Sequence, residues 1–136
     1  TLAEQIAFFH DKTNQIEQLQ QEIEDLKESK AADREEKNSK LNELLQSHLM
    51  TNQNWQNFRR EFQYEYPDFY HTLHQDFPEI TESNLRIILL QKLGFNNVEV
   101  SSLLGITPDA VKKSKQRLKR KLGDKSDELF SRIMSN

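Results

Sequence analysis

The first 66 residues contain neither glycine nor proline, so no residue in this stretch forces a helix to stop. Within it, apolar residues repeat at spacings of three, four and three, the a/d pattern of a coiled coil. We therefore predict a long, coiled-coil-like helix over residues 1–50. Its seam is expected to form a homodimer through four residues, namely Ile16, Leu19, Ile23 and Leu26.

The stretch from residue 28 to residue 40 interrupts this pattern, because its only apolar residues are Ala31 and Ala32. Such a segment is either an exposed helix held by pairs of opposite charge or a hinge. The sequence leaves both interpretations open.

Residues 51–80 form an aromatic connector. Trp55, Phe58 and Phe62 share one face of a helix that Pro67 should stop, and a second short helix should end before Pro78. An aromatic stripe of this kind is compatible with a ligand pocket, but a small hydrophobic core is favoured.

Regular helix-ending signals follow over residues 81–136, and all three glycines stand where a helix should end. Thr81 is expected to cap a helix that Gly94 closes, and Asn96 to cap the next. No strand-like alternation appears anywhere. We predict an all-α fold in which a long N-terminal helix precedes a compact helical bundle.

Within that bundle, residues 96–123 have the plan of a helix-turn-helix. A turn containing Gly105 leads to Thr107 and Pro108, which should cap and begin a second helix that ends at Gly123. The residues predicted to bury the inner face of this motif are Val100, Leu104, Ile106, Val111 and Leu118.

The second helix is strongly basic. Residues 106–123 contain seven Lys and Arg against Asp109 alone, whereas residues 1–50 contain six Lys and Arg against eleven Asp and Glu. This asymmetry is typical of a local element that binds a polyanion. An anionic membrane surface is a weaker alternative, because the apolar stripe of the helix is narrow and lacks large residues.

We predict sequence-specific binding of double-stranded DNA, with helix 108–121 as the recognition helix in the major groove. A helical wheel places Lys112, Lys113 and Gln116 opposite the buried face, where they can reach base edges. The residues expected to hold phosphates are Thr107, Lys115, Lys119, Arg120 and Lys121.

Residues 81–123 resemble the LuxR-type (GerE-like) DNA-binding domain, on the segments 97–100, 103–107, 111–112, 117–118 and 121–123. The resemblance implies the same base-reading residues as the wheel. Three positions depart from the family pattern. Asn84 replaces an acidic residue, so a capping or salt-bridge role should be lost, and Ala110 and Ser114 replace a frequent threonine and histidine. The motif is also similar to region four of sigma factors.

The run from Trp55 to Thr81, with the helix-turn-helix and residues 127–130, is similar to membrane-anchored regulators common in Bacteroidetes. That resemblance implies an N-terminal sensor, often of tetratricopeptide type, one membrane span and this module on the cytoplasmic side. The chain begins at Thr1, so we expect further residues to precede it. No membrane contact is expected within the residues at hand.

Other function classes find little support. The chain has no cysteine and no Gly-rich phosphate loop or nucleophile elbow, so we expect neither an enzyme nor a cofactor. His71 and His74 with Asp76 could begin a metal site, but without a third clear ligand we predict surface histidines and no metal.

Two further alternatives remain. A coiled-coil adaptor would use the basic helix to bind an acidic protein instead of DNA. At the C-terminus, an amphipathic segment should pack on the core or supply a second dimer contact; its apolar residues are Leu129, Phe130, Ile133 and Met134.

Overall fold

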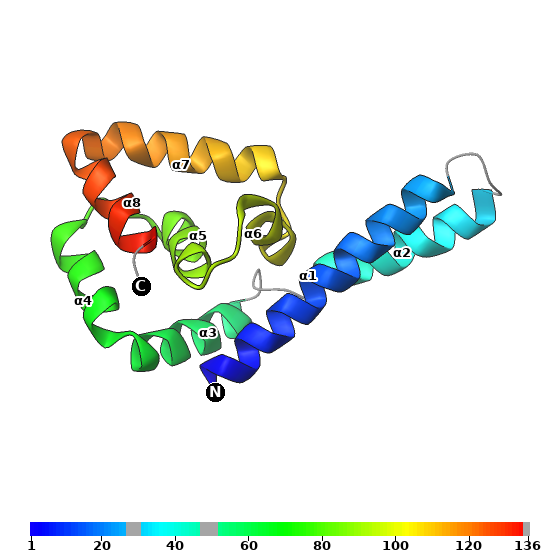
Figure 1. Ribbon diagram of the computed structural model, residues 1–136, viewed down its shortest axis with the longest axis horizontal. Helices are drawn as coiled ribbons and strands as arrows, with labels where there is room; N and C mark the ends of the chain where they lie inside the picture. The colour runs from blue at the N-terminus through cyan, green and yellow to red at the C-terminus, as the bar shows by residue number, and fades with distance from the viewer. Residues whose placement is uncertain (27–30, 47–51, 135–136) are drawn as a thin grey trace.

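The computed structural model describes residues 1–26, 31–46 and 52–134, and within these ranges no residue lies in a β-strand. The predicted all-α fold, a long N-terminal helix followed by a compact helical bundle, is confirmed (Figure 1). The elements are α1 (Leu2–Asp25), α2 (Ala31–Gln46), α3 (Asn52–Glu65), α4 (Pro67–Asp76), α5 (Glu82–Lys92), α6 (Asn97–Leu104), α7 (Pro108–Leu122), a 3₁₀ turn (Gly123–Lys125) and α8 (Ser126–Met134).

Two helices stand where one long helix was expected over residues 1–50: α1 and α2 form an antiparallel hairpin, and its outer part extends away from the bundle (Figure 1). Residues 31–40, which the sequence left open, are helical; residues 28–30 lie outside the described part of the chain. The Lys37 ammonium lies 2.8 Å from the Glu22 carboxylate across the hairpin. This pair lowers the pKa of Glu22 and raises the pKa of Lys37, mainly through their hydrogen bond.

The N-terminal half of α1 belongs to the bundle core, which differs from the expected division into a separate linker over 1–50. Leu2 and Phe9 are almost completely buried. The Phe9 ring lies 5.4 Å from the ring of Phe58 on α3 and 6.3 Å from that of Phe95, just before α6. Leu2 and Phe9, which continue the heptad spacing of Ile16 toward the N-terminus, therefore pack within the same chain.

The aromatic connector forms part of this core, as predicted. Trp55, Phe58 and Phe62 are all buried on α3. Pro67 is the first residue of α4, where its missing amide proton removes no helical hydrogen bond. Helices α3 and α4 thereby meet at a corner: α3 lies on the side of the bundle away from α7, and α4 runs from it toward the C-terminal end of α7 (Figure 1).

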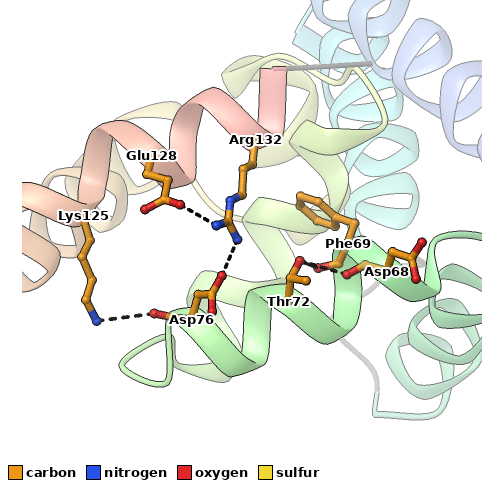
Figure 2. A network of polar contacts seen from close by, with 7 residues as sticks. All are labelled: Asp68, Phe69, Thr72, Asp76, Lys125, Glu128 and Arg132. Atoms are coloured by element: carbon orange, nitrogen blue, oxygen red, sulfur yellow. Dashed lines mark hydrogen bonds and ion pairs between the residues drawn. The ribbon is translucent and has the colours of Figure 1, made fainter.

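Helix α8 packs on the core, which confirms the first of the two alternatives given for the C-terminal segment. Leu129 and Ile133 are buried against α5 and α7. Arg132 donates to Asp76 at the end of α4 (2.8 Å) and to Glu128 (2.5 Å), and this network ties α8 to α4 (Figure 2). None of the described helices combines the length and apolar character needed to cross a bilayer.

Candidate nucleic-acid interface

The turn between α6 and α7 is built from local chemistry. Gly105 adopts a left-handed conformation (φ +69°), which glycine tolerates without steric cost, and the Ile106 amide donates to the Ser101 carbonyl at 3.0 Å. The Thr107 hydroxyl then accepts from the Ala110 amide at 3.1 Å, and Pro108 begins α7. The expected capping of this helix is confirmed.

The preceding helix starts are capped in the same way. Asn96 and Glu99 form the predicted capping box at α6. At α5, the Asn84 amide oxygen accepts from the Thr81 amide at 3.2 Å, while the Thr81 hydroxyl accepts from the Asn84 amide. The expectation that Asn84 loses the capping role is wrong, because its side-chain carbonyl accepts this hydrogen bond as a carboxylate would.

The inner face of the helix-turn-helix is closely packed. The structure confirms the five residues predicted to bury this face. Val100, Leu104, Val111 and Leu118 are buried, and Ile106 is partly buried against the same core. Since α5 and α8 also contact α7, the helix is held from several sides along its apolar stripe. Its opposite face is therefore presented on a rigid support.

That opposite face is exposed and basic. Lys112, Lys113 and Gln116 are all solvent-exposed, as the helical wheel anticipated. Lys113 pairs with Asp109 one turn earlier, at 3.1 Å, although both side chains remain well exposed. Such a pair contributes little to stability, so Lys113 can exchange Asp109 for another acceptor.

The residues assigned to phosphate contacts divide into two groups. Thr107, Lys119, Arg120 and Lys121 are exposed. Lys115 is half-buried: its ammonium lies 3.2 Å from the Asn97 side-chain oxygen and 5.7 Å from the Phe130 ring centroid. Burial lowers the pKa of Lys115, with a smaller contribution from Lys119.

Sequence reasoning did not find this Lys115 cluster. It joins Asn97 at the start of α6 to Phe130 on α8, and Gln91 on α5 also donates to Asn97 at 2.7 Å. Lys119, one turn further along α7, also contacts this ring, with its ammonium 5.0 Å from the Phe130 ring centroid. No periodicity within α7 could reveal it, because the partners come from three other helices.

The histidines noted in the sequence do not gather with further ligands. His71 is exposed, and the His74 Nδ1 atom lies 2.9 Å from the Tyr70 carbonyl oxygen. Within the described residues, no three His, Cys, Asp or Glu side chains lie together as a metal site would require. The candidate binding surface is therefore the exposed basic face of α7.

Comparison with protein-family models, with curated proteins and with solved structures finds no match. The LuxR-type resemblance therefore stays a prediction from the residues of this chain.

Proposed function

We propose that this protein is a sequence-specific DNA-binding transcription regulator of LuxR type, with α7 as its recognition helix. One observation carries the proposal: Lys112, Lys113 and Gln116 are exposed on one face of a helix whose other face is fixed in the core directly after a tight, capped turn. A helix supported in this way can enter the major groove without changing its shape.

The exposed side chains suit the two kinds of DNA contact. Lysine can donate to the guanine O6 and N7 acceptors, and the Gln116 amide can pair with adenine. Arg120 and Lys121, further along the exposed surface of α7, are suited to phosphates, which set the position of a protein on DNA without reading sequence. Lys115, held against Asn97 and Phe130, is better suited to orienting α7 than to a phosphate contact.

Dimerisation is a second part of the proposal. Leu19, Ile23 and Leu26 are only partly buried although α2 covers part of their seam, while Ile16 is buried. We infer that two chains associate through these hairpins and bring two recognition helices to half-sites about 34 Å apart. In this proposal two hairpins associate, in place of the two single N-terminal helices that the heptad pattern predicts. A cytoplasmic location is part of the same proposal, because the protein would act on DNA.

The test is fluorescence-anisotropy binding to random duplex DNA over a salt series. The protein is compared with a Lys112→Ala/Lys113→Ala/Gln116→Ala variant. A matched variant, Lys40→Ala/Arg60→Ala/Gln63→Ala, removes the same charge and one amide from exposed positions on α2 and α3. We expect affinity to fall with salt by about 0.9 log units per log unit of salt for each phosphate neutralised.

The recognition-face variant should bind more weakly and with a shallower salt slope, while the matched variant should behave like the unaltered protein. If the folded protein fails to bind DNA at low salt, or if the two variants lose affinity equally, α7 is not a recognition helix. The coiled-coil adaptor, with an acidic protein partner for the basic helix, would then be the function to test.

A further inference from the structure

A cleft of about 340 Å³ lies between α3, α4 and the first turn of α5. Its apolar lining includes Leu73, Phe77, Ile80 and Leu85. Arg59 of α3 also lines it. A cleft with apolar walls and a fixed charged group is the usual form of a small-molecule site, and this volume lies at the lower end of the usual range of about 300–1,000 Å³.

The carboxylate of Glu82, which also lines the cleft, is already satisfied. One oxygen accepts from Arg59 at 2.6 Å and the other accepts from the Trp55 indole at 3.1 Å. Its charge is therefore compensated within the protein. A cationic ligand would find no uncompensated anion on this side of the cleft.

Arg59 shares this charge pair with Glu82, but its hydrogen-bond donors are not all used. Its Nε–H group donates to the Tyr70 hydroxyl and one Nη1–H group donates to Glu82, but a guanidinium has more N–H donors than these two contacts use. The same contacts hold its plane in one orientation, which lowers the entropy that a further bond would cost. Arg59 can thus offer oriented donors to an acceptor in the cleft.

We propose that this cleft binds a small amphipathic carboxylate. The carboxylate pairs with Arg59, and the apolar part lies on Ile80 and on the narrow exposed edges of Leu73 and Phe77. Glu82 is the first residue of α5, and α5 contacts both α6 and α7, so the ligand would sit beside the support of the helix-turn-helix. The site is independent of whether α7 binds DNA.

Hexanoate is a suitable probe, compared with hexylamine and hexan-1-ol, which have the same chain with a different head. Binding is followed by ¹H–¹⁵N spectra and by emission of Trp55, the single tryptophan, whose indole contacts Glu82. We expect saturable hexanoate binding with shifts grouped at Leu73, Phe77, Thr81 and Leu85. Hexylamine and hexan-1-ol should bind at least about tenfold more weakly, because they cannot accept charge-assisted bonds from Arg59.

Two variants locate the site. Arg59→Gln should weaken hexanoate binding at least about tenfold, whereas Arg60→Gln, the exposed neighbour, should leave it unchanged. Because Arg59 also holds Glu82, Ile80→Phe provides a test that leaves Arg59 in place: the larger ring should reduce the cleft and the affinity with it. Equal binding of all three probes, unsaturable shifts, or full hexanoate affinity in folded Arg59→Gln or Ile80→Phe protein would overturn the proposal.

Discussion

Helices α5–α7 and the outer part of the α1–α2 hairpin bury their apolar side chains to very different extents. Leu89, Leu90, Val100, Leu103 and Val111 are completely inaccessible to solvent. Leu19, Ile23, Leu26 and Leu41 in the hairpin are each only half-buried. A two-helix hairpin has no third layer to cover its seam, so its outer part depends on charge pairs and on whatever binds it.

The boundary between the bundle and the solvated hairpin does not coincide with the end of the charge-rich residues 1–50. The inner half of α1 shares the close packing of the bundle, and only its outer half resembles a solvated helix. The boundary therefore falls within one continuous helix.

Phe9 and Phe8 are adjacent on α1 but differ completely in burial, at 7% and 59% exposed. Phe9→Ala should lower the free energy of unfolding by about 3–5 kcal/mol, because it leaves a cavity among aromatic rings. Phe8→Ala should cost less than about 1 kcal/mol. Urea unfolding followed by Trp55 emission measures both; similar small effects would mean that α1 is not part of the core.

Gly105 tests the local turn of the helix-turn-helix. Gly105→Ala should destabilise the protein by about 1–2 kcal/mol, because its left-handed conformation brings a Cβ atom close to the backbone. Gly105→Asn should cost clearly less, since asparagine tolerates this conformation. Thermal unfolding of the two variants compares them, and equal losses would contradict the backbone explanation.

Asn84 tests the cap of α5. Asn84→Ala should cost about 0.5–1.5 kcal/mol through loss of its hydrogen bond from the Thr81 amide. Asn84→Asp, which restores the acidic residue of the LuxR-type pattern, should keep the stability of the unaltered protein. If chemical denaturation finds the alanine and aspartate variants equally destabilised, the capping box does not stabilise α5.

The Glu22–Lys37 pair tests the hairpin and should give the smallest effect, because both side chains are about one-third exposed. The pKa of Glu22 is lowered in the folded state, so its stabilisation is present above the ordinary carboxyl pKa and is lost as pH falls through the lowered value. The raised pKa of Lys37 gives a contribution that is lost only as pH rises through that raised value.

Glu22→Gln should therefore lower the Tm slightly at pH 7 and not at a pH at which Glu22 is already protonated. Glu43→Gln, at an exposed position of α2, is the matched control. A pH-independent difference between Glu22→Gln and the unaltered protein would show that the pair contributes through packing instead of charge.

Several features of the candidate site could be predicted because they depend on neighbours in the chain. Caps at Thr81, Asn96 and Thr107 each use hydrogen bonds to amides three residues away. The exposed face of α7 follows from helical periodicity in the same way. The prediction for Asn84 was wrong because capping the Thr81 amide requires a side-chain oxygen at the right distance and not a negative charge.

From Thr81 onward, the helix boundaries and the basic outer face of α7 could be predicted from the sequence, because capping, glycine conformation and periodicity act over a few residues. The return of the chain from α1 to α2 could not, since one long helix was expected over residues 1–50. Only the tertiary structure decided that α2 covers part of the seam of α1 and that Lys115 turns toward Asn97 and Phe130. It also decided that Arg59, Trp55 and Glu82 meet beside a cleft. These contacts join residues far apart in the chain, and an apolar or charged side chain does not specify which distant partner will pack against it.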